Sequence, residues 1–442
     1  MIEINEIAKF TNSLKFENIP KRVINKIKIS LLYNISVALA GKRTAEPAIR
    51  VVFNLENKNY KKQNWISTDE LSLDHVAFCN ACMITAISQN ETLYDEMIHT
   101  GCVIIPSALA IGEKQEISGS QFLTALVAGY ETTAAVSEGV ADSSTKKGFR
   151  PTSLYSPFGA SVACCKILKF NEEQIGNSIA IVSNFVGGTM QCWIDGTCEW
   201  LFQVGNASKN AIIATMLASE KKFKGSMNSL TGLYGFYNAY TEKMTFTSGN
   251  FGKKWRTEDV RYKLFPGCAH NQVGIYIAIM MKKKYRIDSE KIEEIIVSMN
   301  KNEYEYPGVN KKKLEGRSSA IMSIAFAISI CFLNGVIENE DYDNYNDLKV
   351  KRLMDKMIIQ SSDEMSIKSC KLVVKMRNGL IYEKLIDKDE NISLYSWNDA
   401  KVFAEKLMSK ASYSKEKINR IITIIETIDE LKNIKRLVEN LK

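Results

Sequence analysis

The chain has 442 residues, of which 45% are hydrophobic and 24% charged, and its formal net charge is +8. Together with only seven prolines, this composition excludes collagen-like, proline-rich and low-complexity disordered chains. It is typical of an enzyme-sized globular protein of roughly two or three domains, and the thinly spread positive charge does not favour nucleic acid as a partner.

Three features predict a soluble, cytoplasmic chain. The first 16 residues include two glutamates and lack an apolar core of about seven residues, so we expect no signal peptide. The longest nearly apolar run, 321–333, is shorter than the roughly 20 residues of a membrane span, so we expect no membrane contact. Cys164 and Cys165 are adjacent and Cys331 lies in the apolar run, which favours reduced thiols over a disulfide framework.

Helical periodicity dominates residues 1–254. Apolar residues between 24 and 39 recur on one helical face, and Gly41 is expected to end that helix. A second helix is predicted after the cap signal at Ser118, and a third after Asn171, where a glutamine three residues later completes a capping box. Small residues are dense near 159–163, which is typical of closely packed helices.

The pattern changes at about residue 255. Residues 293–300 and 369–376 are predicted strands, and Asn378-Gly379 after the second predicts a type I′ hairpin turn. Residues 317–333, between the strands, are predicted to form one buried helix.

Apolar residues at 418–441 return to helical spacing, which predicts a C-terminal helix packed on its own domain. We therefore expect a mainly α protein with an α+β insertion. A large all-helical domain would be built from residues 1–254 and 393–442, and a smaller α+β domain from residues 255–392.

Only three histidines are available for proton transfer near neutral pH. His75 begins a predicted helix and is interpreted as a surface or capping residue. His99 lies in a polar segment just before a buried helix, and His270 follows a loop with a lysine, a proline and a glycine. Each of these last two could line a pocket or be structural.

Further polar residues lie in segments that are otherwise apolar. Arg150 and Thr152 could bind a carboxylate or form an ordinary surface pair. Gln203 lies on a predicted helical face beside Trp200, where a capped helix start with an aromatic anchor is equally expected. The CxxC at 79–82 lacks the second pair that zinc requires, so no metal is expected. No nucleotide-binding or α/β-hydrolase motif is present.

Six short motifs occur in the order seen in the MmgE/PrpD family, which the chain resembles over nearly its whole length. That family includes 2-methylcitrate dehydratase, cis-aconitate decarboxylase and an iminodisuccinate epimerase. The resemblance implies a homodimer whose subunits combine the helical domain with an α+β lid domain, and an active site between the two that uses no metal or organic cofactor. The motifs are PSALA at 106–110, AGYE at 128–131, GFRPT at 148–152, FGA at 158–160, GNASK at 205–209 and KLFPGC at 263–268.

The resemblance also assigns residue roles. His99 matches a family histidine and would be the general acid and base, while Lys263 matches a family lysine and would neutralise developing negative charge. The acidic pair of the family is less clear here, and Glu91 or Asp95 would fix the tautomer of His99. Arg150 would bind a substrate carboxylate, with the hydroxyl of Thr152 orienting it.

The chain also departs from the family pattern. Arg150 stands where cis-aconitate decarboxylase has a histidine, Trp200 where many members have a lysine, Phe326 where a tyrosine is found, and Gln272 where a histidine is found. We include these positions, with Gln203 and His270, among the predicted substrate-binding residues. The changes favour a small acid other than cis-aconitate or 2-methylcitrate, each of which carries three carboxylates.

The predicted activity is proton transfer at a carbon next to a carboxylate or carbonyl of a small organic acid. The reaction would be a dehydration, a decarboxylation or an epimerisation, without a cofactor. The alternative is a catalytically inactive scaffold or accessory subunit that keeps the fold, an idea motivated by Trp200 and Phe326.

Overall fold

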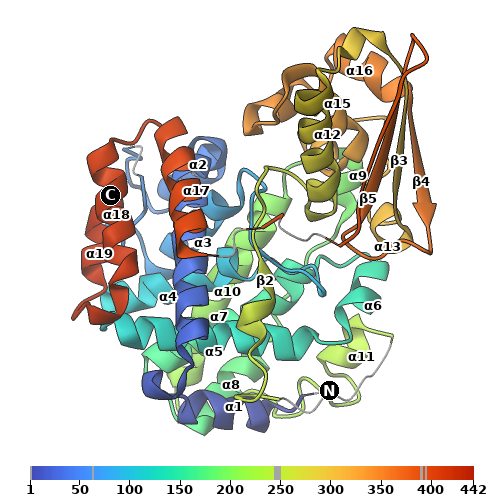
Figure 1. Cartoon of the computed structure of the whole chain (residues 1–442). Coiled ribbons are helices and arrows are strands. Elements are labelled where there is room, and N and C mark those ends of the chain that lie inside the picture. Colours follow the sequence, from blue (N-terminus) through green and yellow to red (C-terminus); the bar gives the residue numbers. More distant parts are fainter. Residues whose placement is uncertain (1, 62–63, 243–249, 389–391, 394–395) are drawn as a thin grey trace.

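The computed structural model describes residues 2–61, 64–242, 250–388, 392–393 and 396–442. Figure 1 shows a large body built from helices and a smaller body in which helices accompany a β-sheet. The chain is thus mainly helical with a small mixed sheet, as predicted. The α-helices in the described residues are α1 Ile4–Ser13, α2 Lys21–Leu55, α3 Leu73–Thr85, α4 Gly101–Lys114, α5 Gly119–Ser137, α6 Ala141–Lys146, α7 Pro151–Ile167, α8 Glu172–Val182, α9 Gln191–Asp195, α10 Trp200–Ser219, α11 Phe236–Tyr240, α12 Gln272–Tyr285, α13 Lys301–Tyr304, α14 Arg317–Met322, α15 Ile324–Asn334, α16 Leu348–Asp355, α17 Trp397–Lys410, α18 Lys415–Glu426 and α19 Lys435–Leu441. The strands are β1 Thr92–Leu93, β2 Val260–Arg261, β3 Ile292–Asn300, β4 Met357–Ser362, β5 Cys370–Met376 and β6 Ile381–Ile386.

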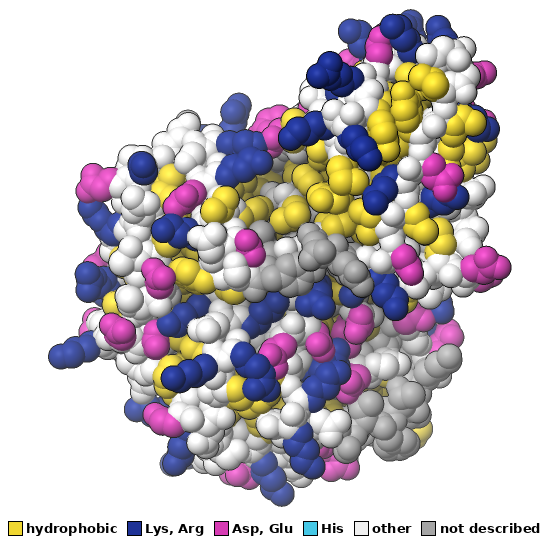
Figure 2. Space-filling model, in the orientation of Figure 1, with side chains coloured by type: hydrophobic (Ala, Val, Ile, Leu, Met, Phe, Trp, Pro, Cys, Tyr) yellow, Lys and Arg dark blue, Asp and Glu magenta, His cyan; other side chains and the backbone are white. Residues whose placement is uncertain are grey.

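Buried apolar side chains form two clusters. The helical cluster includes residues of α1 to α5, α7, α8 and α10, and also of α17 to α19. The mixed cluster includes residues of α12, α14 to α16 and β3 to β5. The chain first contributes to the mixed cluster between Met190 and Trp200 and is back in the helical cluster at Val204. It passes to the mixed cluster again between Tyr262 and Cys268, and it returns between Ile392 and Ala400. Figure 2 shows hydrophobic side chains exposed in the notch between the two bodies.

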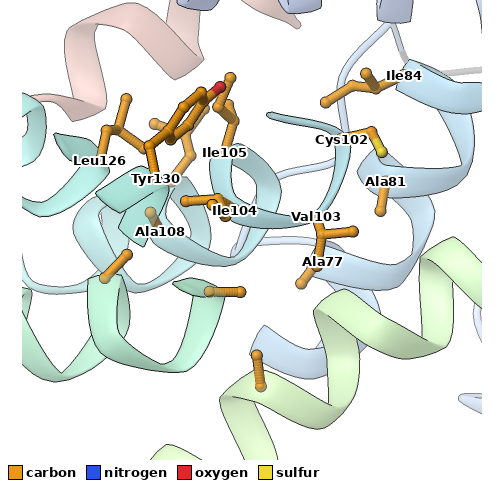
Figure 3. Packing of buried hydrophobic residues seen from close by; sticks show 14 of the residues in the cluster. Ala77, Ala81, Ile84, Cys102, Val103, Ile104, Ile105, Ala108, Leu126 and Tyr130 are labelled. Atoms are coloured by element: carbon orange, nitrogen blue, oxygen red, sulfur yellow. The ribbon is translucent and has the colours of Figure 1, made fainter. Parts of the chain in front are cut away.

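Helix α4 lies at the centre of the helical cluster. Figure 3 shows it between α5, which contributes Leu126 and Tyr130, and α3, which contributes Ala77 and Ala81. These side chains are almost completely buried. Because interiors are packed as densely as organic crystals, the first turn of α4 and His99, two residues before it, rest on a rigid support.

The expected end of the first long helix at Gly41 is wrong, because α2 continues to Leu55. A Cβ atom at Gly41 would lie 2.3 Å from the carbonyl oxygen of Met83, so the glycine allows α2 and α3 to approach closely. Helix α2 is also the helix in the described residues that is long and apolar enough to cross a membrane, but 78% of its apolar window is buried inside the protein. That burial is typical of a core helix of a soluble protein.

The sheet of the smaller body has the strand order β4-β3-β5-β6, with β3 parallel to β4 and antiparallel to β5. The strands predicted at 293–300 and 369–376 are confirmed as β3 and β5. The hairpin that joins β5 to β6 is confirmed, but its type I′ turn is wrong. Gly379 has φ +83° whereas Asn378 does not have a positive φ, and the Gly379 N–H donates to the Met376 carbonyl at 2.9 Å, which makes a three-residue turn.

Two predicted helices are interrupted. Ser323, with ψ 116°, separates α14 from α15, and its hydroxyl accepts the N–H of Phe326, so residues 317–333 are not one helix. A 3₁₀ turn at Ile428–Glu430 separates α18 from α19, where the Leu431 carbonyl accepts the N–H of Gly119 at 2.9 Å. At both breaks, a backbone or side-chain oxygen accepts a hydrogen bond from a neighbouring segment.

The capping boxes predicted at Ser118 and Asn171 are both present.

Candidate active site

A pocket lies where the two clusters meet, and it brings five predicted residues together. Arg150 and Thr152 begin α7, Trp200 begins α10, His99 precedes α4, and Lys263 follows β2. The pocket is lined by Ser88, Asn90, Met97, His99, Arg150, Pro151, Thr152, Trp193, Trp200, Lys263, Gly267, Cys268, Ala269, Tyr306, Ile321 and Met322.

The imidazole of His99 is held in one tautomer by its neighbours. Its Nδ1 lies 2.9 Å from the Glu91 backbone carbonyl and 3.1 Å from the Thr92 hydroxyl oxygen. A carbonyl only accepts hydrogen bonds, so Nδ1 carries the proton and Nε2 keeps a lone pair. Burial, with the charges of Lys263 and Arg150 nearby, lowers the pKa of His99 well below its ordinary value. His99 is therefore a neutral base at pH 7.

Arg150 is a buried cation without an acidic partner among the described residues. Its NH1 donates to the Trp200 carbonyl at 2.7 Å and to Gln203 Oε1 at 3.5 Å. The guanidinium lies over the ring of Trp193, 5.4 Å from its centroid. Only 4% of the residue is exposed, and burial lowers its pKa. These contacts use only NH1, which leaves other N–H groups for an anion in the pocket.

Lys263 is a second buried cation. Its Nζ donates to the carbonyls of Ser88 and Gly267, both at 3.0 Å, and burial lowers its pKa to about 8. The loop that carries it is fixed by Gln272, which accepts the Phe265 N–H and donates to the Phe265 carbonyl, each at 3.1 Å. Gln272 does not line the pocket, so the structure places it behind the lysine loop.

The pocket thus has a distinctive charge pattern. No aspartate or glutamate is among its described lining residues, whereas Arg150 and Lys263 both are. A buried charge without a counter-charge is costly, so an anion that enters the pocket is bound favourably. In the described part of the chain, no group of three or more His, Cys, Asp or Glu side chains is placed to hold a metal ion.

The two predicted acidic partners of His99 lie elsewhere. The carboxyl group of Glu91 is fully buried behind the pocket, where it accepts hydrogen bonds from Tyr130 and from the Thr100 hydroxyl. Burial raises its pKa. Glu91 meets His99 through its backbone carbonyl alone. Asp95 points outward with 73% of its side chain exposed and lies 3.8 Å from the Lys368 ammonium.

Three other predicted residues do not line the pocket. Gln203 supports Arg150 from behind and donates to the Thr189 carbonyl at 2.9 Å. His270 is buried and its Nδ1 lies 3.1 Å from a Glu303 carboxylate oxygen. Phe326 is buried in the mixed cluster, and its ring stacks on that of Tyr342 with centroids 5.6 Å apart.

Sequence reasoning missed two aromatic pocket residues, Tyr306 and Trp193. Tyr306 precedes Pro307 and Gly308, and Gly308 has φ +88°. One sequence feature could have identified Tyr306 as a candidate pocket residue. It is an aromatic residue that lies just before a Pro-Gly break, shortly after a predicted strand. Trp193 lies in a short helix, α9, for which periodicity gives no signal.

A family model described as the MmgE/PrpD N-terminal domain matches residues 5–248. The chain is 22% identical over 328 residues to a cis-aconitate decarboxylase-like protein of Aspergillus oryzae, which covers 69% of this chain and 67% of that protein. It is 18% identical over 469 residues to the cis-aconitate decarboxylase of Aspergillus terreus, covering 98% and 94%. Because the family model matches more than half of its residues, the chain belongs to the MmgE/PrpD family.

Proposed function

We propose that this protein is a lyase that acts on a small dicarboxylic acid by proton transfer at the carbon next to a carboxylate. The observation that carries the proposal is the charge pattern of the pocket, where two buried cations without an acidic partner surround a neutral imidazole. Two cations match two carboxylates, whereas cis-aconitate carries three. The similarity to cis-aconitate decarboxylases supports a lyase.

The roles follow from the geometry. Arg150 holds one carboxylate, and Lys263 neutralises the other as the neighbouring carbon loses its proton. Nε2 of His99 accepts that proton, and the resulting imidazolium is stabilised through its Nδ1–H by the Glu91 carbonyl. In a dehydration, the electron pair of the broken C–H bond then forms a double bond as the adjacent hydroxyl leaves, and the His99 imidazolium gives its proton to that hydroxyl, which departs as water.

The test is exchange of carbon-bound hydrogen in deuterated water. The protein is incubated with C4 to C6 dicarboxylic acids, and NMR follows both the label at the α-carbon and the product. We expect label and turnover with at least one acid. Tight binding of a protein partner, without exchange or turnover on the whole panel, would contradict the proposal and support the inactive scaffold.

Above pH 6.5, the pH profile of kcat/KM should show one decrease, an alkaline limb near pH 8. The pKa of Lys263 is about 8, so its positive charge is lost as the pH rises through that value and dicarboxylate binding weakens. The pKa of His99 is lowered, so the base stays neutral down to pH 6.5 and the profile is flat from there to about 7.5. Lys263→Arg, which stays charged, should remove the alkaline limb. A limb that persists in this variant would contradict the assignment.

We also propose that the protein is a homodimer. Phe202 and Met216 on α10 are 57% and 43% exposed, and they lie fourteen residues, about four helical turns, apart on one face. Phe185, 41% exposed, is held beside them because Asn210 donates to its carbonyl at 2.8 Å. Such a patch favours a protein interface. Light scattering should give twice the mass of the chain, and Phe202→Glu should give the monomer.

A further inference from the structure

Tyr306 is a pocket residue that the mechanism above does not use. It lines the pocket with His99, Arg150 and Lys263, and its hydroxyl has no hydrogen-bond partner in the part of the chain that the structure describes. Burial raises the pKa of Tyr306, so at neutral pH the phenol is protonated and able to donate. A hydroxyl of this kind, without a protein partner, is available to a ligand.

The ring of Tyr306 is held from behind. It packs on the ring of His270 with centroids 4.6 Å apart, and the Tyr306 N–H donates to the Glu303 carbonyl at 3.3 Å. The chain that follows is pressed against the pocket wall, since a Cβ atom at Gly308 would lie 2.8 Å from Cβ of Met322. The tyrosine therefore has little freedom to turn away from the pocket.

His270 is itself fixed by a buried carboxylate. Glu303, only 2% exposed, accepts the Tyr94 hydroxyl at 2.9 Å and the Lys368 backbone N–H at 3.2 Å, while His270 Nδ1 lies 3.1 Å from it. Tyr94 lies in the segment between β1 and His99, so the support of Tyr306 is tied to the loop that carries the proposed base.

Tyr306 is also the one tyrosine among the described residues that line the pocket. The position where the family resemblance implies a tyrosine is Phe326, which carries no hydroxyl and stacks on Tyr342 within the mixed cluster. Phe326 therefore supplies no donor to the pocket, whereas Tyr306 reaches it from a different segment.

We propose that Tyr306 is a further catalytic residue, whose hydroxyl donates a hydrogen bond to the substrate carboxylate oxygen on which negative charge grows as His99 removes the proton. The inference rests on the proposed function. Glu303 and His270 are positioning residues that act through the tyrosine ring. The Tyr306 phenol keeps its own proton, because its hydroxyl only stabilises the negative charge on the carboxylate oxygen by a hydrogen bond. The proton removed from carbon stays on His99 until product forms.

Tyr306→Phe tests the inference, because it removes one oxygen and keeps the ring that packs on His270. We expect kcat to fall about 100-fold, which is typical for the loss of one oxyanion donor, with KM and the calorimetric Kd of succinate changed by less than about threefold and the thermal midpoint unchanged. Tyr304→Phe, which removes a hydroxyl outside the pocket, is the matched control and should behave as the wild type.

His270→Phe tests the positioning role. It preserves a ring against Tyr306 but removes the Nδ1 contact with Glu303, so we expect a smaller fall in kcat, about tenfold, and no further fall when it is combined with Tyr306→Phe. Wild-type kcat in Tyr306→Phe, in a preparation whose wild type turns over a dicarboxylate, would overturn this inference alone. A wild type that neither exchanges nor converts any acid would instead overturn the proposed function.

Discussion

Turnover of the dicarboxylate substrate is expected to fall about 1,000-fold in His99→Asn, within the range found for the loss of a general base. The asparagine amide can still donate to the Glu91 carbonyl, which lies 2.9 Å from Nδ1 in the wild type, so the loop is retained. The variant lacks the Nε2 lone pair that would accept the carbon-bound proton. Deuterium exchange at the α-carbon should fall in parallel.

Two measurements distinguish the loss of the catalytic base from a general disruption of the pocket. The calorimetric Kd of succinate should change by less than about threefold, because Arg150 and Lys263 remain. His75→Asn is the matched control, since His75 pairs with Glu56 outside the pocket, and its turnover should equal that of the wild type. If His99→Asn retains more than a tenth of the wild-type turnover, another group is the base.

Local sequence signals predicted much of the fold. Capping boxes and the alternation of β5 involve residues close together in the chain, and the structure contains them. Arg150 and Lys263 lie within short motifs and His99 lies seven residues before one, and the fold places all three around one pocket.

The errors arose where a distant segment decides the outcome. In the sequence, Gly41 is typical of a helix end. In the structure, the carbonyl of Met83 on α3 lies against it, so a glycine is needed within α2 for close packing against α3. Asp95 lies four residues from His99, but the turn between Leu93 and Ile98, whose backbone groups bond to each other at 2.8 and 3.1 Å, directs its side chain outward. No local pattern reports either contact.

Tyr306 shows the same limit within the site. It comes from the segment after α13, and its place beside Arg150 and Lys263 depends on how the mixed cluster sits on the helical one. A sequence motif identifies only residues that are close together along the chain. The pocket joins residues from at least four separate segments, so its membership could be predicted only in part.

Lys263→Met should separate binding from stability. The variant is expected to bind succinate at least 30-fold more weakly, since it removes one of the two buried cations, yet it should unfold no more readily at pH 7. The pKa of Lys263 falls from 10.5 to about 8 on folding, a difference that costs the folded state roughly 3 kcal/mol at neutral pH. Removing the charge recovers this cost and offsets the two hydrogen bonds lost to carbonyls.

The dependence of stability on pH gives this prediction a definite sign. Between pH 8 and 10.5 the unfolded wild type binds more protons at Lys263 than the folded protein, so wild-type stability rises with pH relative to Lys263→Met and the difference levels off above 10.5. Chemical denaturation at a series of pH values measures it. Lys282→Met is the control, because that lysine also donates to backbone carbonyls, at Phe332 and Leu333, but lies outside the pocket. A wild type that loses stability relative to Lys263→Met over this range would show that Lys263 is not an uncompensated cation, and the dicarboxylate pocket would lose its main support.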